Sequence, residues 1–240
     1  MNSVTIIGSN LIGLLCADIL SEDNEVTIIE SDLELGFPAN YPGTSKQEKL
    51  ISTILKNQDT KNLFILNENG FTNFRSEWFI KLLTHKLAKN NVRISNRTRV
   101  SKITEVNGLL EIYTKGSELD SKDIICNKIL DFSHLSYNTI GNNVHSYDLL
   151  SNKLFKPEIK TKTFFVGICL IKDIKNLTSH EILIPRNDGL AEVWYQNGLE
   201  EFPSQGWIES KLVNSYFDSK LMLLEQYYSK AKEIVENMVI

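Results

Sequence analysis

The sequence predicts an α/β fold in which a parallel β-sheet comes first and a smaller antiparallel lobe with a C-terminal helical segment follows. One observation is that the first thirty or so residues read as strand, glycine-bearing turn, helix and strand. The other is that the second half of the chain carries short strand-like runs separated by turn residues. With 240 residues, of which 42% are hydrophobic, the chain is long enough for one large domain or one domain with a small second lobe.

The opening elements carry the clearest signals. Val4–Ile7 is a β-branched run typical of a buried strand, and Leu11–Leu20 has apolar residues on several helical faces, as in a helix buried against a sheet. Val26–Ile29 is a second buried strand that ends at Glu30. This order predicts a βαβ unit with parallel strands.

The remaining elements are predicted by periodicity and turn residues. Asn107-Gly108 between Val100–Val106 and Leu109–Thr114 indicates a two-residue hairpin. Helices are expected over Lys46–Lys56, Ser76–Asn90 and, bent or in two pieces, Lys211–Ile240; strands are expected over Val92–Ser95, Ile124–Asp131, Thr163–Ile171, Glu181–Ile184 and Ala191–Tyr195. Periodicity fades around residues 138–160, so we expect one domain over residues 1–135 and a second lobe over residues 136–240.

Composition excludes several classes of function. The net charge of −4 and the pI near 5.7, with scattered lysines, predict no nucleic-acid-binding surface. The three cysteines form no CxxC pair and no paired histidine motif occurs, so no metal site is expected. No signal peptide precedes the first strand and Leu11–Leu20 is too short to span a bilayer, which predicts a cytoplasmic protein without stable membrane insertion. The oligomeric state is unknown from the sequence.

The turn after the first strand resembles a dinucleotide fingerprint. It reads Gly8-Ser9-Asn10-Leu11-Ile12-Gly13, which is G-x-G-x-x-G with Asn10 at the middle position. Gly8 permits the sharp turn, Gly13 permits close helix packing, and the helix N-terminus offers N–H groups to phosphates. Asn10 tolerates the turn, but its side chain is expected to intrude where a phosphate would lie.

Glu30 has the position of a ribose-binding carboxylate. It follows Gly8 by 22 residues, at the end of the second strand. Its negative charge repels a 2′-phosphate, which favours FAD or NAD over NADP. The alternative is a generic α/β unit whose glycines serve packing alone.

Three further stretches extend this pattern: Glu30–Phe37 is an acid followed by a glycine turn, Phe74-Arg75 precedes a helix, and Asn127–Ser133 follows the hairpin. With these stretches, the chain resembles the glutathione-reductase-type FAD/NAD(P)-binding Rossmann superfamily. Within it, the chain is most similar to the branch of aromatic hydroxylases, flavin-dependent halogenases and lycopene cyclases. The resemblance covers residues 1–135 and implies a Rossmann-type parallel sheet with a β-meander, of which Val100–Thr114 is part.

The resemblance implies a cofactor site and a function. It assigns cofactor binding to Gly8, Ser9, Asn10, Ile12, Gly13, Glu30, Ser31, Gly36 and Arg75. Arg75 would reach the pyrophosphate or flavin, or else pair with Glu77 at the surface. His134 is the best candidate for a general acid or base. The implied protein is an FAD-dependent oxidoreductase or monooxygenase acting on a small apolar or aromatic substrate, with Tyr41, Trp194, Tyr195 and Trp207 as possible substrate contacts.

The chain also departs from the family's pattern. Asn10 replaces the middle glycine, Phe37 replaces the second glycine of the downstream pair, and Phe132-Ser133-His134 replaces a small residue and glycine. No Gly-Asp motif lies near the C-terminus; the nearest candidates are Asn187-Asp188-Gly189, in reversed order, and Tyr147-Asp148. An alternative is therefore a degenerate, non-catalytic relative that binds a nucleotide weakly or serves as a binding partner, and a third is an NAD-dependent dehydrogenase using His134.

Overall fold

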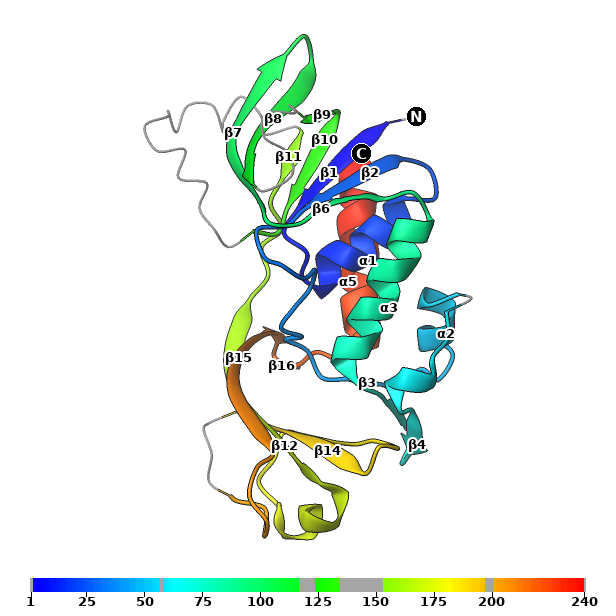
Figure 1. Ribbon diagram of the computed structural model, residues 1–240, viewed down its shortest axis with the longest axis vertical. Coiled ribbons are helices and arrows are strands. Elements are labelled where there is room, and N and C mark those ends of the chain that lie inside the picture. The colour runs from blue at the N-terminus through cyan, green and yellow to red at the C-terminus, as the bar shows by residue number, and fades with distance from the viewer. Residues whose placement is uncertain (1, 57, 117–123, 134–152, 197–200, 240) are drawn as a thin grey trace. The chain divides into compact units, whose positions relative to one another are not determined.

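The structure, a computed structural model, describes residues 2–56, 58–116, 124–133, 153–196 and 201–239 (Figure 1). The chain forms two compact units that are not consecutive stretches of sequence. The first unit comprises Met1–Phe37, Leu83–Glu158 and Tyr228–Ile240, and the second comprises Pro38–Leu82 and Ile159–Tyr227. The predicted division at residue 135 refers to consecutive stretches and stays a prediction.

The first unit is built on a five-stranded parallel sheet. Its strand order is β11-β10-β1-β2-β6. The strands are β1 (Ser3–Ile7), β2 (Glu25–Ile29), β6 (Arg93–Ser95), β10 (Lys128–Asp131) and β11 (Leu154–Phe155). Every pairing in this sheet is parallel, so the carboxyl ends of β1, β2 and β10 meet at one edge. The predicted α/β fold class is confirmed.

Three helices contribute to the first unit: α1 (Leu11–Leu20) and the parts of α3 (Ser76–Lys89) and α5 (Leu224–Val239) that belong to it. Lys86 on α3 forms an ion pair with Asp18 on α1 at 2.6 Å. The Cys16 thiol on α1 donates to the carbonyl of Ala231 on α5 at 3.6 Å. Helix α1 therefore contacts both of the other helices, and Figure 1 shows the three helices together on one side of the sheet.

A three-stranded antiparallel meander packs on the parallel sheet. It consists of β7 (Thr98–Val106), β8 (Leu109–Gly116) and β9 (Ile124–Cys126). Asn107 and Gly108 have φ values of 53° and 79°, as the predicted two-residue hairpin requires. A buried cluster joins the meander to the sheet and comprises Ile7, Ile29, Val100, Ile103, Leu110, Ile112, Ile124, Cys126 and Ile129.

The second unit is built on an antiparallel sheet with strand order β13-β14-β12-β15-β16. Its strands are β12 (Thr161–Leu170), β13 (Ile182–Pro185), β14 (Leu190–Tyr195), β15 (Glu209–Asp218) and β16 (Lys220–Leu221). The unit also holds a small sheet of β3 (Thr44–Ser45), β4 (Leu66–Glu68) and β5 (Phe71–Asn73), the helix α2 (Leu50–Ile54), and the 3₁₀ turns η1 (Lys61–Leu63) and η2 (Ile171–Asn176).

Both faces of the antiparallel sheet are packed. Trp194 lies in a cluster with Phe164, Val166 and Val213 on one face. Tyr195, the next residue, lies in a second cluster with Trp207 among its neighbours. Successive strand residues point to opposite faces, so Trp194 and Tyr195 belong to two separate cores rather than to one cavity wall.

The prediction of a helical pattern from Lys211 was wrong. Residues 209–218 form β15, which pairs antiparallel with β12, and helix α5 begins only at Leu224. Pairing with a strand far earlier in the chain overrides the local pattern. Two other elements are shorter than predicted. The stretch Lys46–Lys56 is helical only over Leu50–Ile54. The stretch Ile124–Asp131 forms two strands that are divided at Asn127, whose side-chain oxygen accepts a hydrogen bond from the Ser3 N–H.

We predict that Gly167→Ala lowers the free energy of unfolding by about 1–3 kcal/mol, the usual cost of overpacking. A methyl carbon at this β12 residue would lie 2.3 Å from Cε3 of Trp207, closer than carbon atoms approach. Urea denaturation would measure the change. In a Trp207→Leu background the same substitution should cost clearly less, because the clashing ring is absent. An equal cost in both backgrounds would contradict this packing account.

Candidate functional site

The turn that follows β1 depends on a glycine. Gly8 has a φ of +84°, and a methyl carbon there would lie 2.9 Å from backbone atoms of both Phe132 and Ser133. Its N–H donates to the carbonyl of Ile29 at 2.9 Å. Gly8 therefore allows the ends of β1, β2 and β10 to approach one another closely.

Gly13 allows the first turn of α1 to sit against the same edge. A methyl carbon on Gly13 would lie 2.9 Å from the carbonyl oxygen of Gly8 and 3.1 Å from the ring of Phe132. Phe132 is buried and donates its N–H to the carbonyl of Ile7. Phe132 thus packs against the fingerprint turn itself.

Asn10 caps helix α1. Its backbone is extended, with φ −60° and ψ 168°, and its Oδ1 accepts from the N–H of Gly13 at 2.9 Å. Asparagine is among the best N-cap residues for this reason. The first-turn N–H groups of Leu11 and Ile12 have no acceptor within the helix, so they remain as donors at the positive end of the helix dipole.

Glu30 is the centre of the polar contacts at this edge. One of its oxygens, Oε2, accepts from the N–H of Ser9 at 2.7 Å and from the Ser9 hydroxyl at 2.6 Å. The other, Oε1, accepts from the Ser31 hydroxyl at 3.1 Å and from the Asp32 N–H at 3.0 Å. The N–H of Gly36 donates to Ser9 Oγ at 2.8 Å. The loop after β2 is thereby tied to the turn after β1.

The structure brings together eight of the nine residues predicted to bind a cofactor: Gly8, Ser9, Asn10, Ile12, Gly13, Glu30, Ser31 and Gly36. The ninth, Arg75, belongs to the second unit, where its Nε lies 3.6 Å from Glu77 Oε2, as the surface alternative expects. Phe37 is 47% exposed. His134, the predicted general acid or base, lies outside the described residues.

The adenosine diphosphate half of a dinucleotide fits this edge. The Leu11 and Ile12 N–H groups offer a helix N-terminus to phosphate oxygens, and Glu30 stands at the end of the adjacent strand. Both carboxylate oxygens of Glu30 already have two donors each, so a ribose hydroxyl has to replace one of them. Asn10 likewise occupies one donor that a phosphate would use.

Comparison with solved structures finds similar folds at low sequence identity. The p-nitrophenol 4-monooxygenase PnpA from Pseudomonas putida DLL-E4 matches with a TM-score of 0.61 and 11% identity, over 100% of this chain and 80% of that chain. A flavoprotein/dehydrogenase from Cytophaga hutchinsonii matches with a TM-score of 0.53 and 16% identity, over 98% of this chain and 76% of that one.

The chain has a flavoprotein fold. Its shared architecture is the parallel sheet with meander, the antiparallel sheet and the C-terminal helix. The Diels-Alderase PyrE3 also matches, with a TM-score of 0.52 and 9% identity, over 90% of this chain and 55% of its own length, so the chain spans about half of that protein. Neither a protein-family model nor a curated protein sequence matches.

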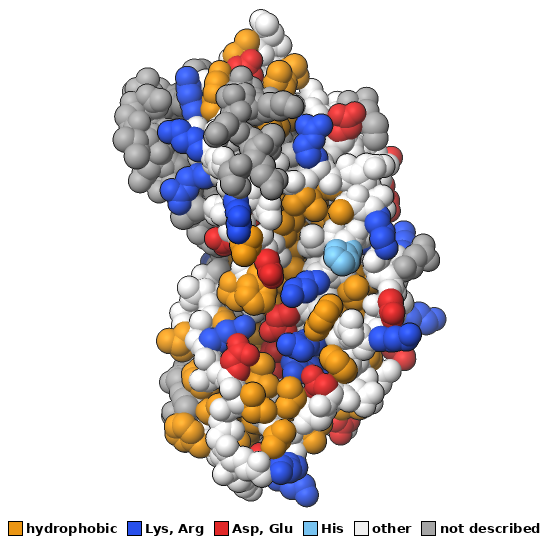
Figure 2. All heavy atoms as spheres, in the orientation of Figure 1, with side chains coloured by type: hydrophobic (Ala, Val, Ile, Leu, Met, Phe, Trp, Pro, Cys, Tyr) orange, Lys and Arg blue, Asp and Glu red, His pale blue; other side chains and the backbone are white. Residues whose placement is uncertain are grey.

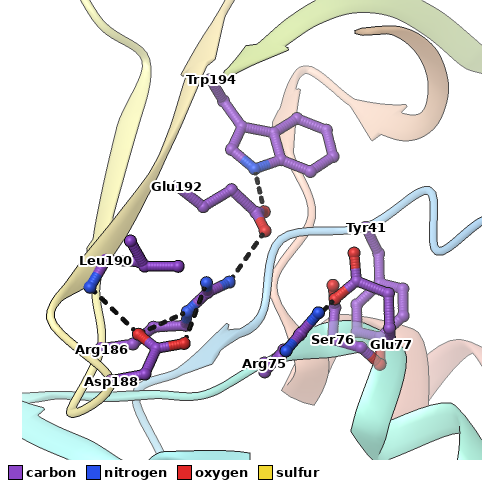
Figure 3. A network of polar contacts seen from close by, with 9 residues as sticks. All are labelled: Tyr41, Arg75, Ser76, Glu77, Arg186, Asp188, Leu190, Glu192 and Trp194. Carbon is purple, nitrogen blue, oxygen red and sulfur yellow. Dashed lines mark hydrogen bonds and ion pairs between the residues drawn. The ribbon is translucent and has the colours of Figure 1, made fainter. Parts of the chain in front are cut away.

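The second unit of this flavoprotein fold contains a network of charged residues that sequence reasoning missed (Figure 3). Arg186 lies at the end of the β13–β14 hairpin with its side chain 1% exposed. Its guanidinium contacts Asp188 at 3.2 Å and Glu192 at 3.9 Å. Glu192 Oε1 accepts from the indole N–H of Trp194 at 2.5 Å. The reversed motif Asn187-Asp188-Gly189 is the turn of this hairpin, with Gly189 at φ +80°.

Burial changes the acid–base properties of this network. It raises the pKa of Glu192 to about 7, and the nearby Glu77 carboxylate adds to the rise, while the Trp194 hydrogen bond, Arg186 and Lys211 oppose it. Burial also raises the pKa of Tyr41, whose hydroxyl donates to the carbonyl of Ser76 at 3.0 Å. In the sequence, the only indication of this network was Glu192, a charged residue within the predicted strand Ala191–Tyr195 and two residues before Trp194.

Other candidate chemistry is absent from the described parts of the chain. Within residues 2–56, 58–116, 124–133, 153–196 and 201–239, no group of three or more His, Cys, Asp or Glu residues is placed to hold a metal ion. All three cysteines are buried and free, and burial raises the pKa of each thiol. No described helix combines the length and apolar character needed to cross a membrane.

We predict that stability falls as the pH rises through the pKa of Glu192. The folded pKa of about 7 lies above the ordinary glutamate pKa of 4.5, so the folded state holds the proton more tightly and this contribution to stability is lost between about pH 5 and pH 8. The shift corresponds to about 3 kcal/mol. Chemical denaturation at a series of pH values should show the decline in the native protein and lose it in Glu192→Gln.

Trp194→Phe is the matched control for this titration. Removing the indole N–H removes a hydrogen bond to the carboxylate, so the midpoint of the decline should move to higher pH. A pH dependence that is the same in the native protein and in Glu192→Gln would show that another group is responsible.

Proposed function

We propose that this chain is an FAD-binding protein of the oxidoreductase or monooxygenase type, acting on a small apolar or aromatic substrate. The observation that supports it best is Glu30, held by Ser9 beside the N-terminus of α1 at the carboxyl ends of β1 and β2. Ligands in open α/β sheets bind at this edge. The names of the similar structures, a monooxygenase and a flavoprotein/dehydrogenase, point the same way.

Each residue at the edge has a defined part in this proposal. The N–H groups of Leu11 and Ile12 bind the pyrophosphate, and Glu30 accepts hydrogen bonds from the ribose hydroxyls. The flavin supplies the redox chemistry when bound, and the protein supplies position and electrostatics. The carboxylate of Glu30 favours FAD, or NAD as the alternative cofactor, over a 2′-phosphorylated nucleotide. His134 remains the proposed general acid or base, and Arg75 the proposed partner of the cofactor's phosphates or flavin.

A second candidate function is a nucleotide-binding relative without redox catalysis. Asn10 favours it, because its side chain already satisfies the Gly13 N–H at the helix N-terminus and so weakens the phosphate site. The similarity to PyrE3, named as a Diels-Alderase, also supports it, because one fold can host unrelated activities.

The first test is substitution of the ribose-binding carboxylate. Glu30→Ala should weaken FAD binding by at least about tenfold, since a charge-assisted hydrogen bond contributes about 1.5–3 kcal/mol. Quenching of flavin fluorescence on titration would measure the affinity. Glu25→Ala, an exposed position at the start of β2, is the matched control and should bind as the native protein does. Equal FAD affinity in all three proteins would place the cofactor elsewhere.

A second test separates the two candidate functions at Asn10. Asn10→Gly releases the Gly13 N–H for a phosphate oxygen and costs the helix only a few tenths of a kcal/mol, because glycine is an acceptable N-cap. We expect FAD affinity to rise by about tenfold, or about 1.4 kcal/mol. Calorimetric titration of FAD into both proteins would measure it. Unchanged or weaker binding would mean that the asparagine cap does not compete with the phosphate.

A further inference from the structure

Within the described parts of the chain, strand β15 has a backbone edge that is unpaired over most of its length. It pairs with β12 along residues 209–216, whereas on its other side β16 pairs only with Phe217 and Asp218. Among the described strands, none covers the remainder of this edge, and Figure 1 shows β15 on the outside of β12. An open edge is a template for pairing with another strand.

The backbone groups that point outward can be assigned. The N–H of Phe217 donates to the carbonyl of Lys160 at 3.0 Å, toward β12. Because successive residues of a strand alternate, the N–H and C=O groups of Ser210, Leu212 and Asn214 point away from β12, toward the open edge. All three of these residues are exposed.

The same edge carries exposed apolar side chains. Leu212 is 71% exposed and Ile208, just before the strand, is 60% exposed. Figure 2 shows apolar side chains at the surface of the part of the molecule that holds the antiparallel sheet. An exposed apolar strand edge is unusual in a protein that stays alone, because it invites association.

We propose that a second copy of this chain pairs antiparallel with β15 about a two-fold axis through Ser210, which joins the two antiparallel sheets into one. In this register Ser210 faces Ser210 of the second copy. Glu209 lies opposite Lys211 of the second copy. The pairing ends there, because the Ile208 N–H points toward β12 and donates to the carbonyl of Ile168 at 2.8 Å. This surface is separate from the proposed cofactor site at Gly8–Gly13 and Glu30, and the proposal does not depend on the proposed function.

Charge complementarity selects both the partner and the register. Opposite charges directly across two strands are favourable and like charges are unfavourable. Moving the axis by one residue places either Glu209 opposite Glu209 or Lys211 opposite Lys211. Of these three axes, only the one at Ser210 pairs each glutamate with a lysine. Lys211 is half-buried on the face that also carries Glu192, and Glu209 is exposed.

Cross-linking tests the register directly. Ser210→Cys introduces an exposed thiol into a chain whose own three cysteines are buried. In an antiparallel hydrogen-bonded pair the two Cα atoms lie about 5.5 Å apart, within disulfide range. Mild oxidation of the full chain should therefore yield a disulfide-linked dimer. Asn214→Cys, the matched control on the same edge, would lie about 27 Å from its counterpart and should stay monomeric on a denaturing gel.

Sedimentation of the uncross-linked protein tests the surface. The native chain should form dimers reversibly, and Leu212→Lys should raise the dimer dissociation constant at least tenfold while the circular dichroism spectrum stays unchanged. A native chain that remains monomeric at every concentration overturns the proposal. So does a dimer that Leu212→Lys does not weaken, or cross-linking that is faster at Asn214→Cys than at Ser210→Cys.

Discussion

The ends of β1, β2 and β10 approach one another closely at Gly8. The proposed cofactor site, formed by the Gly8–Gly13 turn and Glu30, depends on this constraint. Any side chain at this position would collide with the backbone of Phe132 and Ser133, and its φ of +84° excludes most other residues. Because β10 reaches this turn, Phe132 packs against Gly13 and fixes the start of α1. Because β2 reaches it, the carboxylate of Glu30 meets the N–H of Ser9. Both the helix N-terminus and the acid therefore face the same point in space.

The polar groups at this edge satisfy one another before any ligand is considered. Glu30 accepts four hydrogen bonds and Asn10 caps the helix, so the protein alone holds the turn in its observed geometry. Such preorganisation lowers the entropic cost of binding. The same bonds also compete with the ligand, because a ribose or phosphate must replace a donor or acceptor that is already paired. For the cofactor site that we propose, the affinity is the difference between these two effects.

The sequence predicts the first unit better than the second, for a physical reason. Gly8, Gly13 and Asn107-Gly108 are local signals of backbone geometry, and the structure contains the turns and the hairpin that they predict. Strand β15 was predicted as helix because its identity comes from β12, far away in the chain. The Arg186–Glu192 network was missed because burial decides whether charges within a strand are solvated or paired, and burial is a tertiary property. The role of Asn10 as the cap of helix α1 was also visible only in the structure.

The most direct measurement of the central claim, that the Gly8–Gly13 turn and Glu30 form a cofactor site, is the visible absorbance of the purified chain after incubation with excess FAD and removal of free cofactor. We expect the two absorbance bands of an oxidised flavin to remain with the protein, and to be lost on the same treatment of Glu30→Ala but not of Glu25→Ala. A colourless native protein that retains no FAD would contradict the account, and would leave the flavoprotein fold as a scaffold without its cofactor.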